Sequence, residues 1–197
     1  MSCKACREAV DAEADRAKHF HAAHKEVCGC EQYSLTTGRV GDDETLHFIV
    51  SDPDGIINGF INQILVSQID ANGLSVLRDR AEDAEFILSL EQLSARWAER
   101  SRRFCGILNI STHSVRYDEG DRLCCVYDTA EPGKPNHAEI FAPDLQLLAE
   151  AQLSKGELKR RSRQRIKKFV EKAGTDFVTP DSFRGGFLKR FEKAAST

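Results

Sequence analysis

The sequence predicts an α+β fold: a single domain with a small, mostly antiparallel sheet, a long N-terminal helix and C-terminal helices. Two observations support this prediction. Three apolar or alternating runs follow one another between residues 103 and 141, and turn residues separate them, as is typical of antiparallel strands. The two ends of the chain are rich in helix-forming residues. A chain of 197 residues with 41% apolar residues is large enough to bury a core around such a sheet.

We expect three regions: an N-terminal helix with a Cys- and His-rich end over residues 1–30, an α+β core over 44–153, and a basic helix with a tail over 154–197. Residues 4–27 predict one helix, because they are rich in Ala, Glu, Lys and Arg and contain neither Gly nor Pro. The apolar stripe of this helix is thin, so we expect it to pack loosely or against a partner.

Within the core, hydrophobic spacing separates helices from strands. The clearest helix has apolar residues at i, i+4, i+7 and i+11 from Phe86. Gly73 is placed to end an earlier helix. The expected strands are 45–51, 74–77, 103–111, 122–129 and 137–141. The expected helices are 56–69, 80–103, 144–153 and 155–172.

Composition excludes several classes of protein. No apolar run approaches the roughly 20 residues that span a bilayer, so we expect no membrane association. The N-terminus lacks the apolar segment of a secretory signal. With seven cysteines and no export signal, we expect a cytoplasmic protein whose cysteines are thiols or metal ligands.

Charge is distributed unevenly along the chain. The net charge is −3, yet residues 155–172 contain nine Lys and Arg against two Glu, which leaves −10 for the remainder. A basic helix with a narrow apolar stripe can present its cations to nucleic-acid phosphates, and the alternative is a solvated helix that docks on the acidic body. The candidate nucleic-acid-binding residues are Arg160, Arg161, Arg163, Arg165, Lys167 and Lys168.

Two cysteine pairs, Cys3 with Cys6 and Cys28 with Cys30, have the grouping of a four-thiolate zinc site. If residues 4–27 form one helix, however, Cys6 and Cys28 lie about 33 Å apart, so an intramolecular site is excluded and an antiparallel dimer of the helix would be needed. A smaller alternative is a local zinc site. Its candidate ligands are His24, Cys28 and Cys30.

His137 and Glu139 are the strongest candidates for chemistry. They are two residues apart in an expected strand, so both side chains face the same side. A carboxylate beside an imidazole raises the pKa of the imidazole and fixes its tautomer, which suits acid–base catalysis. Arg78 ends one expected strand, and Asp128 ends another at the same end of the sheet as His137 if the loop between them forms a hairpin, so we expect all four residues to share a cleft. The alternative is a polar strand edge that faces water.

Two enzyme families use similar residues. Zinc-dependent deaminases contain His-x-Glu but also need a downstream Pro-Cys-x-x-Cys segment, and no cysteine follows position 125. The order Arg78, then Ser111 and Thr112, then Glu139 loosely resembles the triad of ADP-ribosyltransferase-like enzymes. That resemblance implies an arginine on a dinucleotide phosphate, hydroxyls around a nicotinamide, and a glutamate that stabilises an oxocarbenium-like transition state.

The sequence supports two classes of function. The first is a small toxin- or defence-like enzyme that acts on a nucleotide or nucleic acid, with His137 and Glu139 as the acid–base pair, Arg78 on a phosphate, and the basic helix providing affinity. The second is a non-catalytic adaptor. Its N-terminal helix would bind a protein partner or a second copy of the chain, and its basic helix would dock on nucleic acid or protein.

Overall fold

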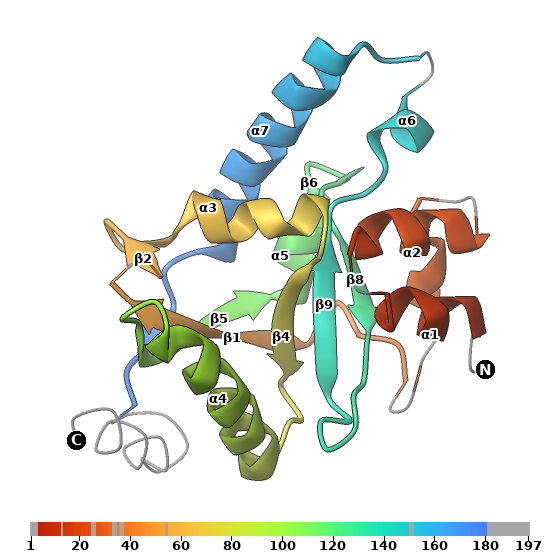
Figure 1. Ribbon diagram of the computed structural model, residues 1–197. Helices are drawn as coiled ribbons and strands as arrows, with labels where there is room; N and C mark the ends of the chain where they lie inside the picture. Colours follow the sequence, from red (N-terminus) through yellow and green to blue (C-terminus); the bar gives the residue numbers. More distant parts are fainter. Residues whose placement is uncertain are drawn as a thin grey trace.

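The computed structural model describes residues 4–12, 14–24, 27–32, 35, 38–53, 55–149 and 152–180, apart from the side chains of His24, Gln32 and Leu147. A six-stranded antiparallel sheet lies at its centre (Figure 1). The predicted α+β fold with an antiparallel sheet is confirmed. From edge to edge the strands are β10 (Phe177–Val178), β5 (Arg103–Ser111), β1 (Thr45–Asp52), β4 (Leu74–Arg78), β9 (His137–Phe141) and β8 (Cys125–Asp128).

Helices and two small hairpins surround this sheet. The helices are α1 (Lys4–Val10), α2 (Arg16–His24), α3 (Gln63–Val66), α4 (Asp83–Ala98), α5 (Thr112–Arg116), α6 (Leu145–Leu148) and α7 (Lys155–Ala173). Short 3-10 turns are η1 (Gly29–Gln32) and η2 (Ser67–Asp70), and the hairpins pair β2 (Ile56–Ile57) with β3 (Phe60–Ile61) and β6 (Tyr117–Asp118) with β7 (Asp121–Arg122).

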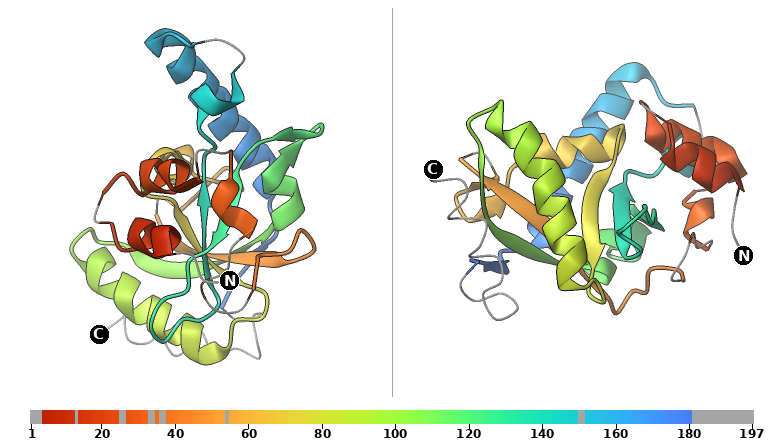
Figure 2. Two further views of the ribbon diagram at one scale, coloured as in Figure 1. Left: turned by 90° about the vertical axis from the view of Figure 1, so that its right-hand side faces the viewer. Right: turned by 60° about the horizontal axis from the view of Figure 1, so that its bottom comes forward.

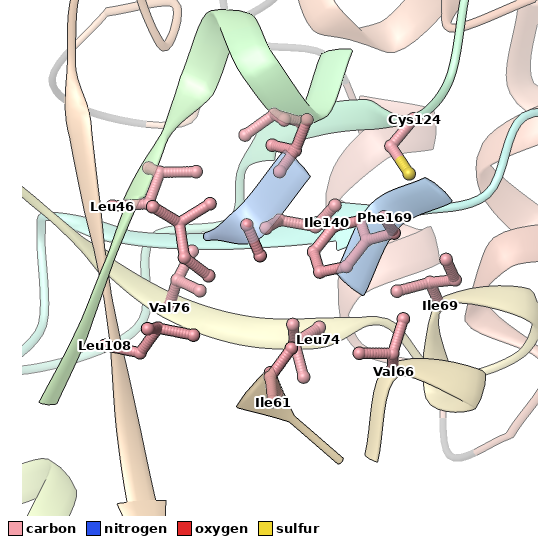
Figure 3. Close-up of a cluster of buried hydrophobic side chains, with 14 of the residues drawn as sticks. Leu46, Ile61, Val66, Ile69, Leu74, Val76, Leu108, Cys124, Ile140 and Phe169 are labelled. Atoms are coloured by element: carbon pink, nitrogen blue, oxygen red, sulfur yellow. The ribbon is translucent and has the colours of Figure 1, made fainter. Parts of the chain in front are cut away.

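The main core lies on the sheet face covered by α3, α5 and α7. Because successive side chains of a strand point to opposite faces, Leu46, Val76 and Ile140 all reach this side (Figure 3). Phe169 of α7 packs among them and is fully buried. The apolar stripe predicted for the basic helix therefore rests on the sheet.

The opposite face is shared by two separate helical groups (Figure 2). Helix α4 packs Phe86 and Leu90 against one half of the sheet. Helices α1 and α2 cover the other half, where the Phe20 ring stacks on Tyr127 with centroids 4.4 Å apart. A cavity lies over the strip of sheet between the two groups.

The predicted long N-terminal helix is wrong: α1 and α2 are short, and the chain turns between them. Asp15 has a positive φ of 52°, a backbone conformation that interrupts a helix. The amide of Ala17 donates to the carbonyl of Ala71 at 2.8 Å, and Phe20 is buried. Packing against the sheet outweighs the helix propensity of the connecting residues, and the apolar stripe is used within the chain.

The helix expected at 56–69 is also wrong over its first half. Asn58 and Gly59 both have positive φ, and they form the tight turn of the β2–β3 hairpin. Asn62 then caps α3 by accepting a hydrogen bond from the amide of Ile64 at 2.9 Å.

The C-terminal part follows the prediction in outline. Helix α7 matches the expected basic helix, whereas the helix expected at 144–153 is reduced to the single turn of α6. Figure 1 shows α6 and the first half of α7 extending away from the sheet. Strand β10, which was not predicted, pairs with β5. Within the described ranges, no helix combines the length and apolarity needed to cross a membrane.

Candidate active site

A cavity of about 530 Å³ lies between α4 and α2, on the sheet face opposite the main core. Its volume is in the range of small-molecule sites. His47 of β1, Ser75 of β4 and His137 of β9 contribute polar groups to its floor, because the strand register places these three positions on one face. The single tryptophan of the chain, Trp97, lines the wall formed by α4.

Basic side chains outnumber acidic ones around the cavity, so its walls favour an anion. The acidic residues in the lining are Glu99 and Glu131. Apolar side chains of the sheet and α4 supply a surface that fits a flat ring. The basic residues in the lining are Arg16, Arg96, Arg100, Arg102 and Lys134.

His137 and Glu139 lie next to each other on β9, as their spacing predicts. Strand β9 is inside the sheet, between β4 and β8, and the two residues are 4% and 1% exposed. The alternative of a polar strand edge facing water is therefore wrong. His137 lines the cavity, whereas Glu139 lies behind Ser75 and Arg16, which do line it.

Glu139 forms an ion pair with Arg16 of α2, a residue 123 positions away in the sequence. Arg16 Nη1 donates to Glu139 Oε1 at 2.5 Å, and the Ser75 hydroxyl donates to the same oxygen at 3.4 Å. The second carboxylate oxygen, Oε2, and the Arg16 Nε are buried without a hydrogen-bond partner in the described part of the chain. Buried polar atoms without partners are costly, and they occur where a ligand or water completes the site.

Burial moves the pKa values of the two strand residues in opposite directions. Desolvation raises the pKa of Glu139 to about 7, although Arg16 lowers it. Desolvation lowers the pKa of His137 to about 4, although Glu131 raises it. The expectation that a neighbouring carboxylate leaves the imidazole with a raised pKa is thus wrong, since loss of water outweighs Glu131. Near neutral pH, Glu139 is the group that titrates and His137 is neutral.

The contacts of His137 fix its tautomer. The Nδ1 atom lies 3.1 Å from the carbonyl oxygen of Thr129 and 3.0 Å from its hydroxyl. A carbonyl only accepts hydrogen bonds, so Nδ1 carries the hydrogen in the neutral ring and Nε2 is the basic nitrogen. Lys134, also in the cavity wall, is tied to Glu131 at 2.6 Å and to Gln92 at 2.8 Å.

Arg78 and Asp128 are placed together, but in a different cluster. Arg78 is fully buried, and its guanidinium donates to both carboxylate oxygens of Glu44 at 2.6 and 2.7 Å and to the carbonyls of Gly38 and Arg39. Asp128 lies 4.0 Å from Arg78 and accepts from the amide of Ala130. This arginine holds the 38–44 loop of the protein itself.

The triad of the ADP-ribosyltransferase-like resemblance is spread over two environments. Ser111 accepts from the Ser114 amide at the start of α5, and the Thr112 hydroxyl donates to the carbonyl of Glu44 at 2.7 Å. Both lie with Arg78 around the 38–44 loop, whereas Glu139 faces the cavity side of the sheet.

The basic residues of α7 differ widely in environment. Arg165 is 6% exposed and pairs with Asp70, and Arg160 and Arg161 pair with Glu157 of the same helix. Lys167 pairs with Glu171, Lys168 pairs with Asp118, and Arg163 is exposed.

The predicted zinc ligands are placed near other cysteines. Cys28 forms a disulfide with Cys125 of β8, so the expectation of thiols or metal ligands is wrong for these two. Cys30 lies in η1, and the side chain of His24 is outside the described residues. In the described ranges, no three His, Cys, Asp or Glu side chains are grouped in a way that could hold a metal ion.

Sequence reasoning missed Arg16, His47 and Ser75. Each reaches the cavity through tertiary structure alone, since Arg16 sits on a helix expected to be separate and His47 and Ser75 are single polar residues in apolar strands. The alternation of β1 and β4 was the one available signal, because it places both residues on the face opposite the core. Comparisons with protein-family models, curated proteins and solved structures found no match to this chain.

Proposed function

We propose that the protein is an enzyme that binds a nucleotide in the cavity between α2 and α4 and uses the Glu139–His137 pair for acid–base chemistry. The observation that carries this proposal is the buried Arg16–Glu139 ion pair at the cavity wall, with a carboxylate oxygen and a guanidinium nitrogen that have no partner in the described residues. A charged pair left incomplete inside a protein is more typical of a site than of a structural contact.

The substrate class follows from the lining. Arg16 together with Arg100 and the other cavity cations favours phosphate groups, because guanidinium groups match phosphate oxygens. The apolar wall around Trp97 favours the base. A toxin- or defence-like role on nucleotides or nucleic-acid ends is compatible with these features, and the cavity form favours a small nucleotide over a duplex.

The proposed roles follow from the two pKa values. Glu139 has a pKa of about 7, so it can both give and take a proton at neutral pH. His137 is neutral, and its Nε2 accepts a hydrogen bond from the substrate or an attacking water. A phosphate that pairs with Arg16 would draw this cation from Glu139, which further favours the protonated carboxyl group.

Trp97 allows a direct test, since it is the single tryptophan and lies in the cavity wall. We expect its fluorescence to change on titration with AMP, ADP or ATP, and less with adenosine or inorganic phosphate. Arg16→Met and Arg100→Ala should each weaken nucleotide binding about tenfold, which corresponds to about 1.4 kcal/mol. Arg163→Ala, an exposed arginine on α7, is the matched control.

Turnover is tested by chromatography of the nucleotide after incubation. We expect Glu139→Gln and His137→Gln to lower the rate at least a hundredfold while nucleotide binding persists. Unchanged fluorescence at millimolar nucleotide would contradict the binding proposal. Binding without any turnover in the wild type would contradict the enzymatic one.

A second candidate, an adaptor that docks through α7, is favoured by the exposed cations on the projecting part of that helix. Duplex RNA or DNA is titrated at several salt concentrations. Arg163→Ala should weaken binding and reduce its salt dependence if the helix contacts phosphates, while Arg100→Ala in the cavity should not. The same two variants therefore separate the two candidates.

A further inference from the structure

Four cysteines from three separate segments of the chain meet under the α1–α2 pair. Cys6 comes from α1, Cys28 and Cys30 flank and enter η1, and Cys125 comes from β8. All four are buried, and they form one cluster with Phe20, Tyr127 and Phe141. The neighbouring Cys124, which directly precedes β8, belongs to the main core instead.

The two sulfurs that are not in the Cys28–Cys125 disulfide lie against each other. Cys6 Sγ and Cys30 Sγ are 2.9 Å apart, and both residues are 3% exposed. A disulfide bond is about 2.05 Å long, so an approach of about 0.9 Å would bond these sulfurs. Their chain positions are 24 residues apart, and the turn between α1 and α2 already brings them together.

We propose that Cys6 and Cys30 are an oxidative modification site that forms a second disulfide, beyond the function proposed above and independent of it. A bond is favoured over a metal because Cys28 and Cys125 are already joined, and because the described residues hold no group of three metal ligands.

The reaction needs a two-electron oxidant, for which a low-molecular-weight disulfide is the chemical class. The Cys30 thiolate attacks one sulfur of that disulfide, and one small thiolate leaves. The Cys6 thiolate then attacks the Cys30 sulfur of the mixed disulfide, and the second small thiolate leaves. Two protein thiols are oxidised, one small disulfide is reduced to two thiols, and two protons pass to the leaving thiolates.

The second bond ties α1 to η1. Among helices and strands, α1 makes its main contacts with α2, so this bond would be its covalent anchor to the body. Helix α2 carries Arg16, which also faces Glu139. The oxidised state therefore joins α1, which packs on α2, covalently to η1.

The test is a thiol count on the full-length chain. The native protein is incubated with oxidised glutathione, then denatured and labelled with N-ethylmaleimide, and the labels are counted by mass. Two disulfides leave three of the seven cysteines to be labelled, whereas the Cys28–Cys125 bond alone leaves five. We expect three labels.

Single variants identify the partners. Cys6→Ser and Cys30→Ser should each raise the count from three to four, because the partner becomes a thiol. Cys105→Ser and Cys3→Ser are matched controls that should lower it from three to two. The wild-type count does not depend on whether the variants fold.

Three outcomes would overturn the proposal. Five labels after oxidation would show that the second bond does not form. Four labels in Cys3→Ser with two in Cys6→Ser would assign Cys3 as the partner. Zinc that copurifies with the chain, with seven labels once it is chelated, would show that the cluster is a thiolate metal site.

Discussion

Two clusters of buried charged residues lie on opposite faces of the sheet, and they differ in how many of their polar atoms have hydrogen-bond partners. In the first, Arg78 and Arg116 are fully buried, and each donates to carboxylates and backbone carbonyls. In the second, Arg16 reaches Glu139 through one nitrogen, and each residue keeps an atom without a partner in the described chain.

The difference in hydrogen bonding indicates that the first cluster holds the fold together. Arg116 bonds Glu31 and Asp42 and two carbonyls, so it holds the 38–44 loop and η1 on the sheet. A buried ion pair of this kind is costly to break, since its partners stay buried. The incomplete cluster beside the cavity has fewer hydrogen bonds within the protein, and the proposed ligand site is built on it.

The largest expected effect is on the satisfied cluster. Arg116→Met leaves Glu31 buried without its fully buried cationic partner and should lower the free energy of unfolding by about 3–5 kcal/mol. Urea denaturation measures this. Arg122→Met is the control, because Arg122 contacts the same carboxylate from a partly exposed position, and it should cost less than about 1 kcal/mol. Equal losses would remove the contrast between the clusters.

The next effect is on the pH dependence of stability. Burial raises the pKa of Glu139 from 4.5 to about 7, so its contribution to stability is present below about pH 4.5 and is lost as the pH rises towards 7. Burial lowers the pKa of His137 from 6.5 to about 4, so its contribution is present above about pH 6.5 and is lost as the pH falls towards 4. Each contribution changes by about 3 kcal/mol over its pH range, and because one falls while the other rises, their pH dependences nearly cancel between pH 4.5 and 6.5.

Single variants reveal each slope in urea denaturation from pH 4.5 to 7. Relative to wild type, Glu139→Gln should gain unfolding free energy as the pH rises, and His137→Gln should lose it. The double variant should again run parallel to wild type. If both single variants ran parallel to wild type, neither residue would have a shifted pKa.

A smaller effect concerns the Arg16–Glu139 pair. The Arg16 charge lowers the pKa of Glu139, so Arg16→Met should raise this pKa above its value of about 7. Carbon-13 NMR of the glutamate carboxyl carbons follows the titration. Lys18→Met, an exposed cation on the same helix, should leave the pKa of Glu139 in place. An unchanged pKa in Arg16→Met would mean that the pair does not form in solution.

The smallest effect serves as the baseline for both clusters. Arg163 on α7 is exposed, and Arg163→Ala should leave the free energy of unfolding within about 0.5 kcal/mol of wild type. Urea denaturation at neutral pH checks this. A larger loss would show that the basic helix contributes to the fold through its exposed face.

Local pattern predicted the five longest strands, β1, β4, β5, β8 and β9, and the two longest helices, because alternation and helical spacing are properties of short segments. The break between α1 and α2 was not predictable in this way, since it depends on Phe20 meeting Tyr127 across more than 100 residues. The same limit applies to the site. The adjacency of His137 and Glu139 follows from the period of a strand, whereas the approach of Arg16 follows from the chain turning back on the sheet.

Glu31 and Arg116 also have a consequence for self-association. The outer edge of β8 would expose backbone groups to which a strand of another molecule could add. At Val126, the amide is bonded by the Glu31 carboxylate, and the carbonyl accepts from Arg116 at 3.2 Å. The side chains of this ion pair thus bond the backbone groups of Val126 to which a seventh strand would otherwise bond. At the other edge, β10 is two residues long and offers little to pair with. Replacing the Glu31 side chain would open this edge as a template for aggregation.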